Sequence, residues 1–127
     1  MEKEIKILIV EDEGIQAMGL EETLEQAGYQ VVGIADSSEE VLQFVAASPI
    51  DLIVMDIHIK GEMDGIDTAK LVREERPEMP IIYLTAYMDQ ETIRRAAETS
   101  PAGYITKPYR QLQLLSNIEQ ALAENKK

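Results

Sequence analysis

Short apolar segments alternate along this chain with amphipathic segments, and almost no linker separates them. The apolar segments are rich in β-branched residues, which is typical of buried strands. The segments between them repeat apolar residues at helical spacing. Strands that alternate with helices are joined by right-handed crossovers, so the sequence predicts an α/β fold with a mainly parallel sheet covered on both faces. We expect the strands at residues 5–10, 29–35, 50–56, 81–85 and 102–106.

The expected helices carry recognisable signals at their ends. Gly28 lies where the first helix would stop, and Pro49 ends the second. Ser37 is followed three residues later by Glu40, a spacing that predicts a capping box at the start of the second helix. Helical spacing in the three later helices predicts buried side chains at Ile66, Ala69 and Val72, at Ile93, Ala96 and Ala97, and at Leu112, Leu115, Ile118 and Leu122.

Length and composition indicate one domain, residues 1–127, with a hydrophobic fraction of 45% that is sufficient for a core. No apolar run approaches the ~20 residues that span a membrane, and the charged residues 1–4 do not resemble a signal peptide. Absence of cysteine removes disulfides and thiolate metal sites. We therefore expect a cytoplasmic protein without membrane insertion.

The net charge is −12. Nucleic-acid binding depends on Lys and Arg that neutralise phosphates, so this balance argues against a nucleic-acid partner. An acidic excess favours solubility, cations or a basic partner surface.

Acidic, hydroxyl and ammonium side chains stand at the ends of four expected strands. Glu11 and Asp12 follow the first strand and Asp56 ends the third. Thr85 ends the fourth, and Lys107 follows the fifth. In open α/β sheets, ligands bind beyond the carboxyl ends of the strands. If the first and third strands are neighbours, the three carboxylates converge at one rim.

Such a cluster favours a cation, because two carboxylates ~4 Å apart repel by about 4 kcal/mol at an effective dielectric of 20. An oxygen-only ligand set suits Mg²⁺. With Lys107 and Thr85 at the same rim, the residues form a set suited to phosphoryl transfer onto Asp56. A carboxylate is ionised at neutral pH, so it needs no general base.

Each of these residues also has an ordinary structural reading. The acidic run 11–13 fits a solvated turn before a helix, and Lys107 fits an exposed loop lysine. Their occurrence together with Asp56 favours a functional site. His58 is the only histidine, and with no cysteine beside it zinc is disfavoured.

The sequence resembles the receiver domains of two-component response regulators, including the chemotaxis response regulator, over essentially its whole length. This resemblance implies a doubly wound, flavodoxin-like fold with five parallel strands in the order 2-1-3-4-5 and five helices. The segments that carry it are residues 7–13, 51–56, 63–65, 84–86 and 104–108.

The resemblance also implies roles in a metal site. Asp56 would be the phospho-acceptor and, with Asp12, a direct Mg²⁺ ligand. Glu11 would act through metal-bound water, and the backbone carbonyl of His58 would complete the protein ligands.

The same resemblance implies a switch. Thr85 and Lys107 would bind the phosphoryl group, and Tyr104 would be the aromatic residue whose rotamer changes on activation. The peptide bond between Lys107 and Pro108 is often cis in this family.

The implied function is a phosphorylation-dependent switch and not a turnover enzyme, with slow intrinsic hydrolysis of the aspartyl phosphate. A sensor histidine kinase or a phosphotransfer protein would supply the phosphoryl group. These residues contain no output domain, so we expect a separate downstream output protein or onward transfer of phosphate. Whether the phosphorylated form becomes a homodimer stays open.

Two departures from the family pattern stand out. Glu11 occupies a position where Asp is frequent, and the segment 59–65 lacks a common proline and is one residue longer than in the chemotaxis regulator. Three alternatives are weighed: a flavodoxin-like flavin or nucleotide binder, a phosphatase with an aspartyl-phosphate intermediate, and an interaction scaffold that takes no phosphate. The acidic loop after the first strand disfavours the first alternative, and His58 disfavours the second because it stands where such phosphatases place a second acid.

Overall fold

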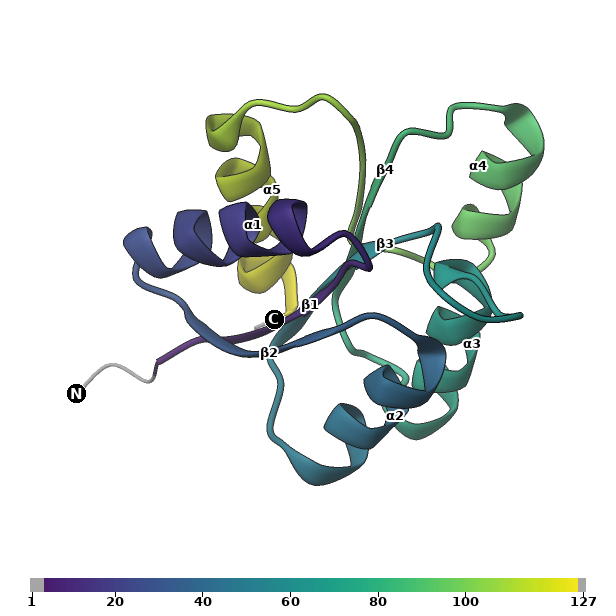
Figure 1. The fold of residues 1–127 in the computed structure, drawn as a ribbon, viewed down its shortest axis with the longest axis horizontal. Helices are drawn as coiled ribbons and strands as arrows, with labels where there is room; N and C mark the ends of the chain where they lie inside the picture. The colour runs from purple at the N-terminus through teal and green to yellow at the C-terminus, as the bar shows by residue number, and fades with distance from the viewer. Residues whose placement is uncertain (1–3, 126–127) are drawn as a thin grey trace.

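The computed structural model describes residues 4–125, so residues 1–3 of the charged N-terminal segment lie outside the described residues. Five parallel strands form one sheet in the order β2-β1-β3-β4-β5 (Figure 1). This confirms the predicted fold class and strand order. The strands are β1 (Lys6–Val10), β2 (Gln30–Ala35), β3 (Leu52–Asp56), β4 (Ile81–Thr85) and β5 (Gly103–Thr106).

Five helices connect and cover the strands, and they pack on both faces of the sheet (Figure 1). Side chains alternate along each strand, so each central strand contributes to two separate cores. Leu8 and Ile53 belong to the core beneath α2 and α3, whereas Ile7 and Leu52 belong to the core beneath α1 and α5. The helices are α1 (Gly14–Gln26), α2 (Ser38–Ala47), α3 (Gly65–Glu75), α4 (Gln90–Ala97) and α5 (Gln111–Asn125).

Central strands β3 and β4 are buried along their whole length, as expected for a sheet covered on both faces. Four of the five strands begin one or two residues later than predicted, whereas β4 has the predicted bounds. The difference arises because apolar residues such as Ile50 are buried in the turn before the strand pairs. Among residues 4–125, no helix is long and apolar enough to cross a membrane.

The buried face of α3 was predicted correctly, since Ile66, Ala69 and Val72 are fully buried. In α4, Ala96 is buried as predicted, but Ile93 is 42% exposed and Ala97 is also exposed, so that part of the prediction was wrong. The physical reason is that polar contacts hold much of α4 in place.

In α5, the prediction that Leu112 faces the core was also wrong, because its side chain is 80% exposed. The buried face follows Leu114, Ile118 and Ala121, with Leu115 half-buried at its edge. Sequence spacing alone fits both faces, and packing against the sheet selects the second.

Helix caps differ partly from the prediction. Ser37 accepts a hydrogen bond from the backbone N–H of Glu40, but the Glu40 carboxylate accepts from the N–H of Asp36, so the box is not closed as predicted. A closed capping box occurs instead at the start of α3, between Asp64 and Asp67.

Candidate functional site

Carboxylates from two neighbouring strands meet at the carboxyl edge of the sheet. Strand β1 pairs in parallel with β3, with Val10 opposite Met55, so both strands end at the same rim. Carboxylate oxygens of Glu11, Asp12 and Asp56 lie within 4.8 Å of one another. Glu11 is 5% exposed and Asp56 is 8% exposed. The predicted convergence of these three side chains is therefore confirmed.

Lys107 supplies a positive charge to this cluster. Its ammonium donates hydrogen bonds to Glu11 Oε1 at 3.0 Å, to Asp56 Oδ2 at 3.1 Å and to Gln16 Oε1 at 2.7 Å. An ammonium has three N–H groups, so each finds one acceptor. The backbone N–H of Lys107 donates to the carbonyl of Thr85, and the peptide bond to Pro108 is cis, as is common in the resembled family.

Gln16 was not among the predicted site residues. It lies on the exposed side of α1, and its side-chain N–H donates to Glu13 Oε1 at 3.1 Å. That contact orients the amide so that its oxygen faces Lys107. A glutamine on an exposed helical face gives no sequence signal for such a contact.

Burial and charge act against each other in the cluster. Burial raises the pKa of Glu11, and the hydrogen bond from Lys107 only partly opposes this effect. Burial acts to lower the pKa of Lys107, but its hydrogen bonds to Glu11 and Asp56 outweigh burial, so the net shift is upward. Lys107 therefore stays protonated at neutral pH and shares its charge between two acidic groups.

The two oxygens of Asp56 have different partners. Oδ1 accepts the backbone N–H of His58 at 3.0 Å, and Oδ2 accepts Lys107. Thr85 is fully buried at the end of β4, and its hydroxyl accepts the backbone N–H of Tyr87 at 3.1 Å. The Tyr87 hydroxyl lies 3.4 Å from Nδ1 of His58. The segment after β3 is thus hydrogen-bonded to Asp56, and the segment after β4 is hydrogen-bonded to Thr85.

Tyr104 is half-buried on β5, and its hydroxyl donates to the backbone carbonyl of Tyr87 at 2.7 Å. Its ring lies edge-on to that of Tyr83, with 6.1 Å between centroids. Tyr104 and Thr85 therefore contact the same short segment after β4 through different atoms of Tyr87.

The loop after Asp56 is tied to the segment that follows β2. Lys60 forms an ion pair with Asp36 at 3.0 Å, and its backbone N–H donates to the Asp36 carbonyl. Gly61 has φ +97°, a conformation that glycine adopts without strain. These contacts hold the loop beside the turn that follows β2.

The donors at this rim are suited to a hard cation. Glu11, Asp12 and Asp56 offer carboxylate oxygens, which Mg²⁺ and Ca²⁺ prefer over nitrogen or sulfur ligands. Lys107 contacts two of the same three carboxylates, so the ammonium and a metal ion would compete for them. Acidic groups at this position would repel an unaccompanied phosphate, which disfavours a flavin or nucleotide phosphate here.

Comparison with known proteins agrees with this geometry. The family model described as response regulator receiver domain matches residues 7–119. The chain therefore belongs to the family of receiver domains found in two-component response regulators, which are regulatory domains and not turnover enzymes.

Individual relatives support the same assignment. The signal receiver domain of a modulated diguanylate cyclase from Desulfovibrio desulfuricans G20 is 35% identical, with a TM-score of 0.89 and 98% coverage of both chains. A CheY-like receiver domain protein from Methanospirillum hungatei JF-1 is 27% identical, with a TM-score of 0.91 and 98% coverage of both chains.

Among curated proteins, the transcriptional regulatory protein PdtaR of Mycobacterium tuberculosis is 33% identical over 118 residues. That match covers 93% of this chain and 57% of PdtaR. ZraR of Escherichia coli K12 is 34% identical, and the match covers 94% of this chain but 26% of ZraR. The chain thus spans between about a quarter and just over half of these curated relatives.

Proposed function

We propose that Asp56 accepts a phosphoryl group in the presence of Mg²⁺ and that phosphorylation changes the affinity of this domain for a partner protein. The observation that carries the proposal is the arrangement around Asp56, whose carboxylate lies beside two further acidic groups and contacts Lys107. Membership of the receiver-domain family supports the proposal.

In the proposed reaction, an Asp56 oxygen forms a P–O bond as the P–N bond of a phosphohistidine breaks. The electron pair of that bond goes to the imidazole nitrogen of a sensor histidine kinase or phosphotransfer protein. Bound Mg²⁺ would neutralise charge on the phosphoryl oxygens, and Asp12, Asp56, the His58 carbonyl and, through water, Glu11 would hold it. Water later attacks the phosphorus slowly, the P–O bond to Asp56 breaks, and inorganic phosphate leaves as the carboxylate is restored.

Lys107 and Thr85 are the proposed phosphoryl ligands. Lys107 already lies 3.1 Å from Asp56 Oδ2, so a small shift of its ammonium would reach an oxygen of the attached group. The Thr85 hydroxyl would stop accepting the N–H of Tyr87 and would donate its own O–H to a phosphoryl oxygen. That exchange would free the segment to which Tyr104 is bound and allow the proposed change of its rotamer.

Output is proposed to pass to a separate protein or through onward phosphate transfer in the cytoplasm. Phosphorylation adds about −1.5 to −2 charge, which shifts the population between two conformations with different partner affinities. Homodimerisation is one form that the output could take.

Incubation with acetyl phosphate and Mg²⁺, followed by intact-mass measurement, tests the proposal. We expect a gain of one phosphoryl group in the wild type, none with a chelator, and none in Asp56→Asn. Asp51→Asn is a matched control, because Asp51 lies just before the other end of β3 and receives the backbone N–H of Lys6. If the wild type gains no mass, or if Asp56→Asn still gains it, the proposal is wrong.

A further inference from the structure

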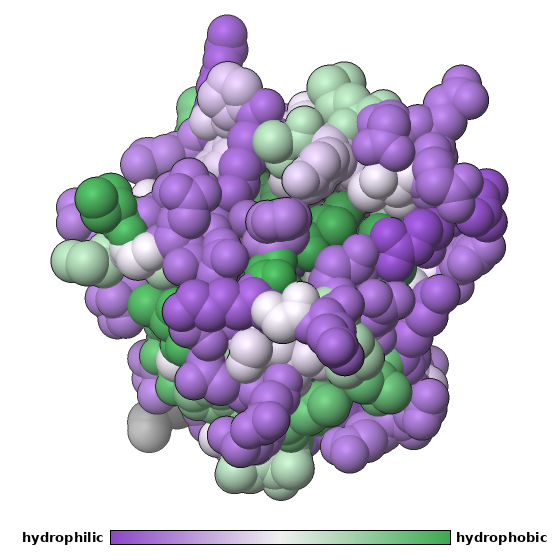
Figure 2. Space-filling model, turned by 45° about the vertical axis from the view of Figure 1, so that its right-hand side comes forward, coloured by the Kyte–Doolittle hydropathy of each residue, from purple (hydrophilic) through white to green (hydrophobic). Residues whose placement is uncertain are grey.

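Helix α4 is held with little apolar contact. Within α4, all of which the structure describes, Ala96 is the buried residue, and Ile93 is 42% exposed. Figure 2, turned so that the right-hand side of Figure 1 comes forward, shows a mostly hydrophilic surface with separate apolar patches. A helix with so few buried apolar side chains opens or shifts at low cost, so its polar contacts decide where it lies.

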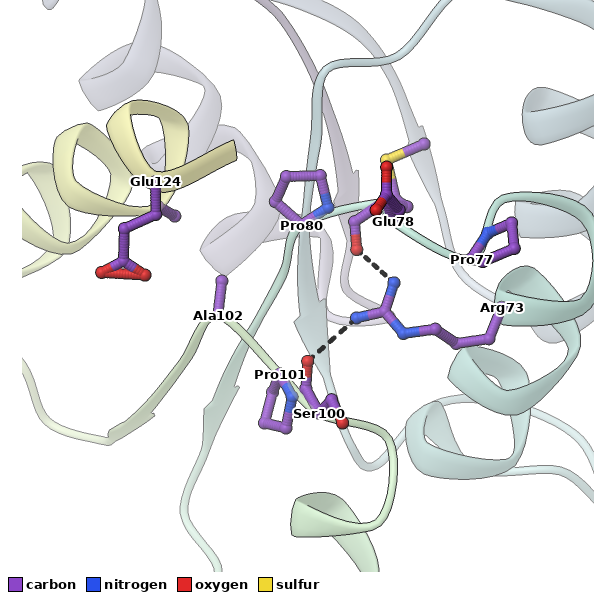
Figure 3. Close-up of a pocket in the computed structure, with 10 residues that line it drawn as sticks. Arg73, Pro77, Glu78, Pro80, Ser100, Pro101, Ala102 and Glu124 are labelled. Carbon is purple, nitrogen blue, oxygen red and sulfur yellow. Dashed lines mark hydrogen bonds between the residues drawn. The ribbon is translucent and has the colours of Figure 1, made fainter. Parts of the chain in front are cut away.

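The segment just after α4 is anchored firmly. The buried Thr99 hydroxyl lies 2.7 Å from the Tyr83 hydroxyl on β4. Arg73 of α3 donates to the carbonyls of Thr99 at 2.9 Å, Ser100 at 3.1 Å and Met79. Figure 3 shows the Arg73 guanidinium reaching from α3 to Ser100. This end of α4 is therefore a fixed point.

A second attachment joins α4 to the start of α3. Arg95 donates to both carboxylate oxygens of Asp64, at 2.9 Å and 3.3 Å, and to Asp67 at 3.3 Å. Arg95 is 28% exposed and Asp64 is 30% exposed, so water screens the pair only in part. Arg95 lowers the pKa of the Asp64 carboxyl, although burial acts in the opposite direction.

Gly65, the residue after Asp64, packs closely against the backbone of Asp56, the proposed phosphoryl acceptor. A Cβ placed on Gly65 would collide with the Asp56 carbonyl oxygen and lie 2.9 Å from the Cα of Ile57. The backbone N–H of Gly65 donates to the Ile57 carbonyl at 2.6 Å. Because of this close packing, a movement of the backbone after Asp56 would also displace the first turn of α3.

That backbone is hydrogen-bonded to the side chain of Asp56. The N–H of His58 donates to Asp56 Oδ1 at 3.0 Å, and a phosphoryl group or a metal ion on the carboxylate would weaken this bond. A continuous path of hydrogen bonds and adjacent residues thus runs from the Asp56 carboxylate through residues 57–58, Gly65 and Asp64 to Arg95.

We propose that the ion pair of Arg95 with Asp64 couples the phosphorylation state of Asp56 to the position of α4. The coupling rests on the proposed function and uses contacts separate from those of Thr85 and Tyr104. By linkage, a partner that prefers one position of α4 also changes the affinity of Asp56 for a phosphoryl group by the same factor.

Hydrogen–deuterium exchange of residues 90–97 tests this coupling, with and without Mg²⁺ and beryllofluoride as the phosphoryl mimic. The variant is Arg95→Gln. Arg94→Gln is the matched control, because Arg94 pairs with Glu91 and Glu98 within or next to its own helix. Asp64→Asn provides a second variant that retains an N-cap side chain while removing the charge.

In the wild type, the mimic should change exchange across α4. In Arg95→Gln, we expect resting exchange to rise about two- to five-fold, the range for a partly exposed ion pair, and the response to the mimic to shrink. Asp64→Asn should behave likewise, and Arg94→Gln should match the wild type.

A full wild-type response in Arg95→Gln, or an equal loss in Arg94→Gln, would overturn the coupling alone. So would a wild type that binds the mimic without any change in α4. A wild type that binds no mimic would overturn both the coupling and the proposed function.

Discussion

Replacing Lys107 by methionine removes the positive charge that Glu11 and Asp56 share. The side chain keeps a similar length, so the change is mainly electrostatic. In the variant, two nearly buried carboxylates face each other without a counter-charge, with Asp12 beside them. We expect the variant to be less stable than the wild type at neutral pH in the absence of divalent cations.

The magnitude follows from the distances. Carboxylate oxygens no more than 4.8 Å apart repel by about 3.5 kcal/mol at an effective dielectric of 20. Removing one partner of a buried ion pair typically costs about 3–5 kcal/mol. We therefore expect the free energy of unfolding to fall by about 3 kcal/mol, which corresponds to roughly 10 °C in Tm for a chain of this size.

The pH dependence has a defined sign. Burial raises the pKa of Glu11 in the folded protein, so this carboxylate destabilises the fold above that pKa and the effect is relieved as pH falls through it. Loss of Lys107 removes an interaction that lowers the Glu11 pKa. The stability difference between variant and wild type should therefore shrink as pH decreases from neutral toward 5.

Urea unfolding at neutral pH with a chelator, followed by the same measurement with Mg²⁺, provides the assay. Mg²⁺ should stabilise the variant more than the wild type, because Lys107 no longer occupies the same oxygens. Lys70→Met is the control, since Lys70 lies 3.9 Å from Glu98 with both side chains about half exposed. Equal stability of variant and wild type in chelator, or equal gains from Mg²⁺, would refute the reasoning.

Three further predictions concern the scaffold. Gly65→Ala should lower the free energy of unfolding by about 2–3 kcal/mol in urea, because its Cβ meets the backbone of Asp56. Gly19→Ala, with open space around it within α1, should raise the Tm, whereas Gly28→Ala at φ +96° should lower stability by about 1 kcal/mol. Burial raises the pKa of Tyr83 to about 12, so stability should fall as pH rises from about 10 to 12, by on the order of 2 kcal/mol. Tyr83→Phe should remove that loss in denaturation series at alkaline pH.

The architecture was predictable because its signals are local. Strand β3 is apolar throughout and ends in Asp56, so both its burial and the place of its carboxylate follow from a few consecutive residues. The convergence of Glu11 with Asp56 followed from the rule that parallel strands present their carboxyl ends at one edge, together with the strand order 2-1-3-4-5 that the family resemblance implied.

The missed contacts join residues that are far apart in the sequence. Gln16 meets Lys107 across 91 residues, and Arg95 meets Asp64 across 31. No periodicity in the sequence predicts either pair, because Gln16 and Arg95 lie on polar faces of their helices. The error at Ile93 has the same origin, since an apolar residue at helical spacing is buried only if the helix is pressed onto the core.

The chemistry of the site explains why its cation is a lysine. The three acceptors of the Lys107 ammonium come from three elements, at the ends of β1 and β3 and in α1. A compact ammonium on a flexible stem can give up one acceptor and keep the others, whereas the planar guanidinium of arginine would bind one carboxylate through two bonds. In the proposed reaction this charge neutralises carboxylates at rest and then contacts an attached phosphoryl group, so it would have to move by small steps. For Lys107→Arg we therefore expect a stable fold that is phosphorylated more slowly by acetyl phosphate, and an unchanged rate would show that mobility of the charge is not required.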